Sequence, residues 1–193
     1  MKKTFFCIFT LFACAGLFAQ QPGKTYNIGD VGPAGGIVFY DKGVFSDNWR
    51  YMEAAPVDAG IPVPTAQWGL WGVTVKGTSD EIGMGKNNTK LIVAEMKQNG
   101  EKGKAAQLCD DYSLNGYSDW FLPSLNELNQ LYLNLKQKDF GNLGNFWYWS
   151  STEATGKNAW SRTFVHPSKY SGNAGMTRPE KTMPFHVRPI RYF

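Results

Sequence analysis

The sequence predicts an α+β domain, and two observations lead to this prediction. Short β-rich segments lie towards both ends of the chain, whereas helical periodicity dominates its middle. Apolar residues make up 42% of the chain and aromatic residues 15%, which is typical of a packed globule and not of a disordered chain. No internal repeat is present, and roughly 170 residues after the N-terminal segment are ample for one core, so we expect one domain.

Two strands are expected early in the chain. The run GGIVFYD, residues 35–41, is apolar and β-rich and follows the turn signals of GDVGPAGG. The run WRYMEAAP, residues 49–56, is expected to form the second strand. Residues 61–85 are dense in Gly, Pro, Trp and Thr, and we expect a long irregular region there with at most short strands.

Three helices are expected in the middle of the chain. The first lies in NNTKLIVAEMKQNG, with Asn88 or Thr89 as its cap and Asn99-Gly100 as its stop signal. The second lies in GKAAQLCDDY and ends near residue 112. The third follows Pro123.

The third helix has the clearest local signal in the chain. Ser124 and Glu127 have the spacing of a capping box, in which each side chain accepts a hydrogen bond from the backbone of the other. This role is the better interpretation of Glu127 than acid catalysis. The residues at spacings of three and four form one apolar face: Leu125, Leu128, Leu131, Tyr132 and Leu135.

The pattern then returns to strands, in FWYWSST, AWSRTFV and the terminal FHVRPIRYF. Alternation along the first of these puts Trp147 and Trp149 on one face and Tyr148 on the other. Pro189 has no N–H for a ladder, so the last strand needs an edge position or a bulge there. We expect the first and last strands to pair.

The N-terminus indicates export. Lys2 and Lys3 precede an apolar stretch that is too short for a membrane anchor, so residues 1–19 are predicted to be a signal peptide and residues 20–28 a short linker. The alternative, ranked second, is lipidation of Cys14. Cleavage after Ala19 leaves Cys109 as the one cysteine, so no internal disulfide is expected. We expect a periplasmic, cell-surface or secreted protein, with no transmembrane segment after cleavage.

The basic residues are distributed unevenly. The formal net charge is +4, and from residue 157 onwards seven basic residues stand against one acid, Glu180. Such a segment suits anionic partners, although scattered solubilising charge is the better explanation for any one lysine.

The residues offer little for catalysis or for a cofactor. Ser150 and Ser151 lack the glycines of a nucleophile elbow, and both histidines, His166 and His186, are in or beside expected strands. Two histidines and one cysteine give no zinc spacing, and Cys109 is expected in the core. We therefore expect a protein that is not an enzyme and has no cofactor. A structural calcium site stays an open alternative, because loops rich in Asp, Asn and Gly can supply oxygen ligands.

The order of several motifs resembles a known family. GGIVFY, WRYMEAAP, GKNNTKLIV, GYSDWFLPSLNELNQLY, YWSSTE, NAWSRTF and VRPIRYF occur in the order found in exported bacterial domains typified by the C-terminal domain of the Lcl collagen-like adhesin. The resemblance covers residues 29–193. Residues 120–128 are also similar to the W-R-L-P-T-x-x-E-W helix of the sulfatase-modifying, C-type-lectin-like superfamily, with Phe121, Ser124 and Leu128 where that pattern has Arg, Thr and Trp.

The resemblance implies a single C-type-lectin-like domain over residues 29–193, with paired terminal strands, two main helices and long loops at one end. It also implies a surface or secreted ligand-binding module, and the typifying adhesin domain binds sulfated glycans. The cysteine pair and the histidines that the superfamily's oxidases and iron enzymes use are absent from this sequence. A collagen-like stalk is also absent, so trimerisation does not carry over and the oligomeric state stays open.

The ligand face of such domains is commonly built from the last strands and the loop between them. The expected partner is a glycan, anionic or sulfated, bound through aromatic stacking and basic contacts; nucleic acid is not expected. The alternative is a protein-interaction or structural role at the cell envelope, with a host or cell-surface protein as partner. An ordinary solvated loop is about as good an explanation of these residues. The candidate ligand-binding residues are Trp149, Ser151, Asn158, Trp160, Arg162, His166, Lys169, Tyr170, Asn173 and Arg178.

Overall fold

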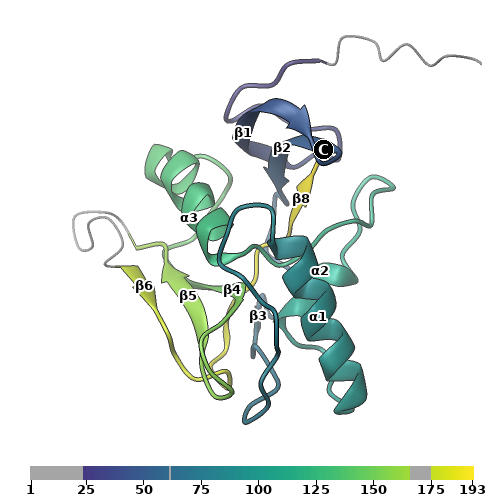
Figure 1. Cartoon of the computed structure of the whole chain (residues 1–193). Helices are drawn as coiled ribbons and strands as arrows, with labels where there is room; N and C mark the ends of the chain where they lie inside the picture. The colour runs from purple at the N-terminus through teal and green to yellow at the C-terminus, as the bar shows by residue number, and fades with distance from the viewer. Residues whose placement is uncertain (1–23, 61, 166–174) are drawn as a thin grey trace, which may run out of the picture.

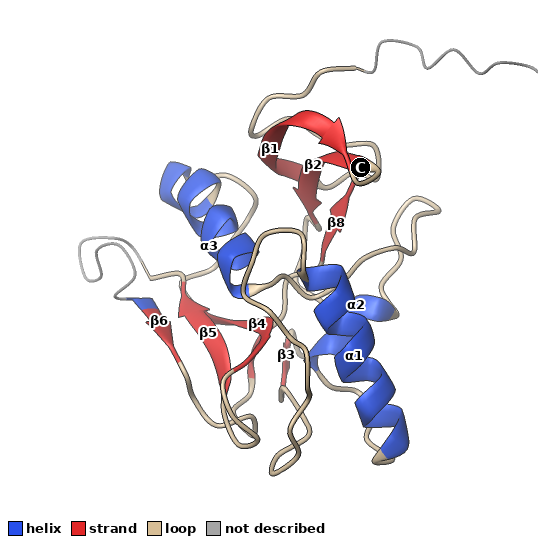
Figure 2. Cartoon of the chain, viewed as in Figure 1, coloured by secondary structure: helices blue, strands red, loops and turns tan. Residues whose placement is uncertain are grey.

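A computed structural model describes residues 24–60, 62–165 and 175–193 of the chain (Figure 1). Helices and strands are both present, so the α+β class is confirmed (Figure 2). The predicted signal peptide and Cys14 lie outside the described residues. Tyr26, within the expected linker, packs its ring edge-on against Tyr51 and Phe193, at centroid distances of 5.4 and 5.1 Å.

The smaller sheet joins the two ends of the chain. It has the order β1-β2-β8, and both pairings are antiparallel. The expected pairing of the first and last strands is therefore wrong in one respect, because the last strand pairs with the second strand and not the first. The strands are β1 (Ile37–Ser46), β2 (Trp49–Ala54) and β8 (Ile190–Tyr192).

The larger sheet has the order β3-β7-β4-β5-β6. Its pairings are antiparallel except that of β4 with β7, which is parallel. The terminal run is divided into β7 and β8 around Pro189, as the missing N–H requires. Among the described residues of the expected irregular region, 62–85, β3 is the one strand. The strands are β3 (Thr65–Ala66), β4 (Trp147–Glu153), β5 (Ala159–Thr163), β6 (Met176–Thr177) and β7 (Phe185–His186).

The three expected helices form, but the first begins earlier than predicted. They are α1 (Gly85–Gln98), α2 (Ala105–Asp110) and α3 (Leu125–Asn134), and a 3-10 turn at Lys136–Lys138 follows α3. The N-cap of α1 is Met84, without a side-chain cap, so the assignment of Asn88 or Thr89 is wrong. Their side chains are buried and bonded elsewhere: the Asn88 amide with the backbone of Ser79, and the Thr89 hydroxyl with the backbone of Leu122.

The capping box of α3 is confirmed. The Ser124 hydroxyl accepts from the N–H of Glu127 at 3.3 Å, and the Glu127 carboxylate accepts from the N–H of Ser124 at 2.8 Å. The buried residues of the helix include four members of the predicted apolar face, from Leu125 to Tyr132.

Strand β4 lies between two helical layers, and both of its faces are buried. Trp149 packs in one cluster with residues of α1 and α2, and Tyr148 packs in another with residues of α3, β1 and β2. The predicted alternation is confirmed, because Trp147 and Trp149 both contact the ring of Phe185, at centroid distances of 5.8 and 4.7 Å. Figure 1 shows α1 and α2 on one side of β4, and α3 on the other. The middle of β4 is therefore not available for contact with a ligand.

Candidate functional site

The predicted ligand-binding residues divide into a buried group, a surface group and a group outside the described residues. His166, Lys169, Tyr170 and Asn173 belong to the last group. The site is therefore built from the other six.

Three of the predicted ligand-binding residues lie in the core. The prediction that they contact a ligand at the surface is therefore wrong. The Trp149 indole N–H donates to the carbonyl of Ala66 at 2.9 Å. The Ser151 hydroxyl lies 3.2 Å from the amide nitrogen of Asn88, which donates to it. The sequence pattern placed these residues on the correct strand but could not show that both faces of that strand are covered.

Arg162 is the third buried residue. Its guanidinium lies over the ring of Tyr132 on α3, 3.9 Å from the ring centre, at a site where the side chain is almost completely enclosed. Burial lowers the pKa of Arg162, and the interaction with Tyr132 opposes this effect. Arg162 thus joins the sheet to α3.

The other three residues, Asn158, Trp160 and Arg178, meet at the surface. Ser161 pairs with Thr177, so Trp160 on β5 lies across from Arg178, just after β6. The Arg178 guanidinium lies over the Trp160 ring, 5.1 Å from its centre. The Asn158 side-chain amide donates to the carbonyl of Arg178 at 3.0 Å. We call Trp160 and Arg178 the Trp160–Arg178 pair.

The pair stands beside a short loop that holds its own shape. In this loop, residues 154–158, the N–H groups of Ala154 and Thr155 both donate to the carbonyl of Asn158, at 3.0 Å each. The Thr155 hydroxyl accepts from the N–H of Asn158 at 3.1 Å. The loop connects β4 to β5, and Asn158 is fixed in place through these bonds.

The charge count of the C-terminal segment overstated its positive surface. Four of its seven basic side chains are buried: Arg162, Lys181, Arg188 and Arg191. Three of these four pair with carboxylates: Lys181 with Glu153, Arg188 with Asp58, and Arg191 with Glu53 and Asp119. Among the described residues, the basic side chains of this segment that are exposed are Lys157 and Arg178.

The buried Lys181–Glu153 ion pair supports the base of the loop. The Lys181 ammonium lies 2.5 Å from Glu153, whose carboxylate also accepts from the N–H of Val75 at 2.9 Å. Burial lowers the pKa of Lys181, and Glu153 partly offsets this effect. Glu153 thus helps to fix the base of the loop.

Trp71 and Lys157 are two surface residues that were not among the predicted ligand-binding residues. Trp71 is 50% exposed, and the Lys157 ammonium lies 5.2 Å from the centre of its ring. The backbone of Gly72 donates to the carbonyl of Gly156 at 2.8 Å, so the two segments lie side by side. No local pattern could have identified Trp71, because the motif WGLWG, residues 68–72, contains two tryptophans, of which Trp68 is completely buried and Trp71 is exposed.

The residues considered for catalysis are held in structural contacts. Ser150 and Ser151 are both buried, and the Ser150 hydroxyl donates to the carbonyl of Trp160 at 2.8 Å. His186 bonds to Asp58 at 2.8 Å and stacks on Phe146 at 4.0 Å. Burial raises the pKa of the Cys109 thiol. Within the described ranges, no three His, Cys, Asp or Glu side chains gather where they could hold a metal ion.

The comparisons with known proteins place the chain in a family. A search of curated proteins found no match. A fimbrial protein from Bacteroides ovatus, solved at 1.85 Å, is similar at 18% identity and a TM-score of 0.46 over 76% of this chain, and the chain spans 36% of that protein's length. In the part of the chain that the structure describes, none of the helices is both long and apolar enough to cross a membrane. The sequence model of the Lcl C-terminal domain matches residues 66–191, which is more than half of the chain, so the protein belongs to the Lcl C-terminal domain family.

Proposed function

We propose that this protein is an exported, non-enzymatic binding module with a C-type-lectin-like fold, and that it recognises an anionic glycan at the Trp160–Arg178 pair. Membership of the Lcl C-terminal domain family fits an exported surface or interaction domain. The signal-peptide pattern at residues 1–19 agrees with export.

The observation that carries the proposal is the guanidinium of Arg178 resting on the Trp160 ring. None of the ion pairs among the described residues involves Arg178, although its side chain is exposed. An arginine held by an aromatic ring has lost part of its conformational freedom before binding, and its planar N–H groups match a sulfate or carboxylate in bidentate geometry.

The neighbouring groups suit a sugar. The Trp160 side chain is partly exposed, and the hydroxyl of Thr155 and the amide of Asn158 lie within the adjoining loop. A sugar ring presents apolar C–H faces and hydroxyl rims, so aromatic and amide groups side by side are complementary to it.

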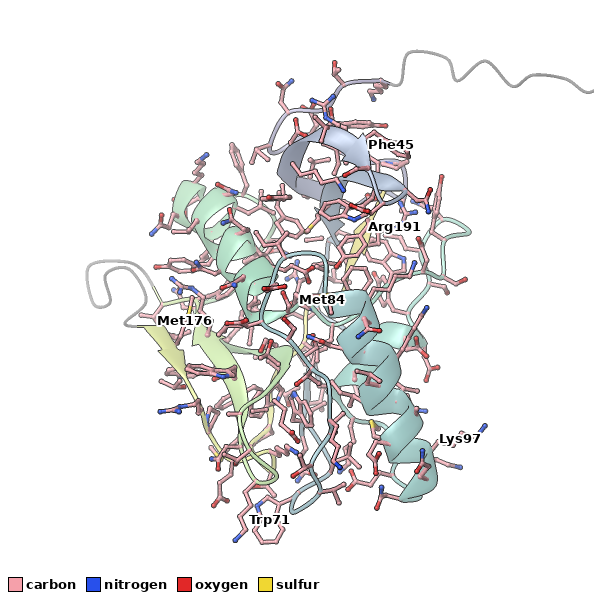
Figure 3. The ribbon with its side chains drawn as sticks, in the orientation of Figure 1. Phe45, Trp71, Met84, Lys97, Met176 and Arg191 are labelled. Atoms are coloured by element: carbon pink, nitrogen blue, oxygen red, sulfur yellow. The ribbon has the colours of Figure 1, made fainter. Side chains whose placement is uncertain are left out.

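The test is a glycan panel that contains sulfated, carboxylated and neutral polysaccharides, applied to the chain from Gln20. We expect binding of the anionic members at low salt and much weaker binding at high salt, because exposed charges are screened. Arg178→Ala should lower the affinity about tenfold or more, which is the range for loss of a charge-assisted hydrogen bond. Lys97→Ala is the matched control, because it removes an equal charge at the far end of α1 (Figure 3).

One further arm of this panel, with chelator, tests the calcium alternative. Chelator should leave binding unchanged if calcium has no part in the site. If the wild-type protein binds no member of the panel, or if Arg178→Ala and Lys97→Ala have equal effects, the proposal is wrong.

A protein-interaction role is the second candidate function, and a different surface favours it. Val44 and Phe45, at the end of the β1–β2 hairpin, are 65% and 57% exposed. Phe45 and Trp71 project from opposite ends of the molecule in Figure 3. Capture of a cell-surface protein that is lost in Phe45→Ser but retained in Arg178→Ala, and that does not weaken with salt, would favour this candidate.

A further inference from the structure

The segment 68–72 turns a single tryptophan outwards at the end of the molecule that carries the 154–158 loop. Trp68 and Leu70 are completely buried, whereas Trp71, which follows Leu70, is half exposed. Figure 3 shows Trp71 projecting beyond the ribbon. We call residues 69–72 the Trp71 loop.

The backbone of the Trp71 loop adopts a conformation that most side chains avoid. The φ angles are +92° at Gly69, +56° at Leu70 and +85° at Gly72. Glycine accepts positive φ readily, but a leucine in this region is unusual and unfavourable. Such residues persist only where the surroundings hold them, and they gather at functional sites. The unusual conformation is what lets Leu70 point inwards while Trp71 points outwards.

Three contacts from separate parts of the chain hold the loop. Both carboxylate oxygens of Glu101, between α1 and α2, accept from the N–H of Leu70 at 3.0 Å. The buried Lys181 ammonium donates to the carbonyls of Leu70 and Val73, at 3.3 and 2.8 Å. Gly72 bonds to the 154–158 loop through the carbonyl of Gly156. The position of Trp71 is therefore set before any ligand arrives.

We infer that Trp71 is a second contact for the same ligand, a stacking platform for a sugar ring whose anionic substituent meets Lys157. This inference rests on the proposed function and extends it. Lys157 and Asn158 are consecutive, and Lys157 approaches Trp71 while Asn158 bonds to Arg178. Because these two residues belong to the 154–158 loop, the ligand we infer is an oligosaccharide that runs along this loop and contacts both Trp71 and the Trp160–Arg178 pair.

The physical basis is preorganisation. A tryptophan ring has few rotatable bonds, and the loop that carries it is already ordered, so little entropy is lost on binding. The Lys157 ammonium beside the ring supplies the positive charge that an anionic substituent requires.

The first experiment measures the affinity of the whole chain from Gln20 for dextran sulfate fragments of increasing length, with neutral dextran beside them. We expect Trp71→Ala to weaken binding of long fragments about 3- to 10-fold and to leave single sulfated sugars unaffected, whereas Arg178→Ala weakens binding of both. Trp71→Phe should restore most of the affinity. Because Trp71 is exposed, these variants are expected to fold normally, and thermal unfolding checks this.

The outcomes separate this inference from the proposed function. If Arg178→Ala weakens binding and Trp71→Ala does not, the inference is wrong and the proposed function stands. If Trp71→Ala weakens binding of long fragments and Arg178→Ala has no effect, the Trp71 contact is supported and the Trp160–Arg178 pair is not. If the wild-type chain binds no fragment, both are wrong.

The second experiment tests Glu101 as a positioning residue. Removing this carboxylate makes the protein more positive, so on charge alone Glu101→Ala should strengthen binding of a polyanion. We expect the opposite, a loss similar to that of Trp71→Ala, because the Leu70 N–H loses its acceptor and the loop relaxes. In the Trp71→Ala background, Glu101→Ala should cause no further loss, because the ring that it positions is already absent. Additive losses, or tighter binding in the single variant, would overturn the positioning role.

Discussion

Glu127 joins three segments at a single buried carboxylate. One oxygen accepts from the N–H groups of Gly83 and Gly85, at 2.8 and 3.4 Å, and from the Tyr192 hydroxyl. The other accepts from the N–H of Ser124. The residue therefore ties the start of α1 and the last strand to the start of α3, which is a wider role than the capping of α3 alone.

Burial raises the pKa of Glu127, although its hydrogen bonds lower it in part. The folded protein therefore holds this proton more tightly than the unfolded chain does. The stability that this group contributes is complete below the unfolded pKa, about 4.3, and is lost as pH rises through the higher folded pKa.

We expect the free energy of unfolding of the wild type to decrease over this window, and Glu127→Gln to lack this decrease. The variant should also be less stable by roughly 1–3 kcal/mol, because an amide cannot accept from all four donors. Urea denaturation at a series of pH values measures both effects. Glu180→Gln, at an exposed carboxylate, is the control and should follow the wild-type profile. If the free energy of unfolding of Glu127→Gln decreases with pH as it does in the wild type, the decrease belongs to another titrating group.

Lys181 and Glu153 form a second buried polar contact, and its two halves should be strongly coupled. Lys181→Met leaves the Glu153 carboxylate buried without its cation, which should lower the free energy of unfolding by about 3–5 kcal/mol. In Lys181→Met/Glu153→Gln the charge is absent, and the amide oxygen can still accept from Val75, so much of the loss should be recovered. Denaturant midpoints of the four proteins give the coupling. A double variant that is less stable than Lys181→Met would contradict the expected coupling.

Among the elements, α1 and α3 approach closely at their N-termini, and Gly85 permits this approach. A Cβ on Gly85 would lie 2.9 Å from both the Phe121 ring and the backbone nitrogen of Ser124, and it would overlap the Glu127 carboxylate. Packing therefore requires a residue without a Cβ at position 85, because the backbone at the start of α1 contacts the N-terminal cap of α3.

Gly85→Ala should be destabilising by about 2 kcal/mol or more, although alanine is favoured over glycine in a helix by about 1 kcal/mol. Gly100→Ala is the control: that glycine has a φ of +69° and open space around it, so only backbone strain of roughly 1 kcal/mol is expected. Thermal unfolding of the two variants measures the difference. A neutral or stabilising Gly85→Ala would show that the helix starts can separate without loss.

At the scale of the whole molecule, the segment before the family match belongs to the same folded unit. The family model begins at residue 66, but β8 pairs with β2, and Arg191 and Arg188 bond to Glu53 and Asp58. One core cluster also contains residues of β1 and β2 together with residues of α3.

A chain that begins at residue 66 should therefore fail to fold cooperatively. It leaves β8 without its partner strand β2, removes Asp58 from the buried Arg188, and removes one of the two carboxylates that pair with Arg191. Each of these losses is destabilising. Far-UV circular dichroism during thermal unfolding tests this, with the chain from residue 24 as the folded control. A sharp cooperative transition in the shorter chain would show that the N-terminal hairpin is dispensable.

Local patterns determined the secondary structure. The capping box of Ser124 and Glu127, the alternation around Tyr148 and the interruption at Pro189 depend on residues close in sequence, so the chain alone specifies them. The cap of α1 was wrong because Asn88 and Thr89 bond to distant backbone groups, which no local pattern contains.

The positions of charged and aromatic side chains were decided only by the tertiary structure. Arg191 and Glu53 are 138 residues apart in sequence, and a count of charges cannot show that such a pair neutralises itself inside the fold. Trp149 and Trp71 are equally apolar, yet the first lies between two helical layers and the second projects from a loop held by Glu101 and Lys181. By itself, therefore, the sequence determined the α+β class, the order of the elements and the capping of α3. The tertiary structure decided which residues form a surface, because exposure depends on what the rest of the chain brings against each side chain.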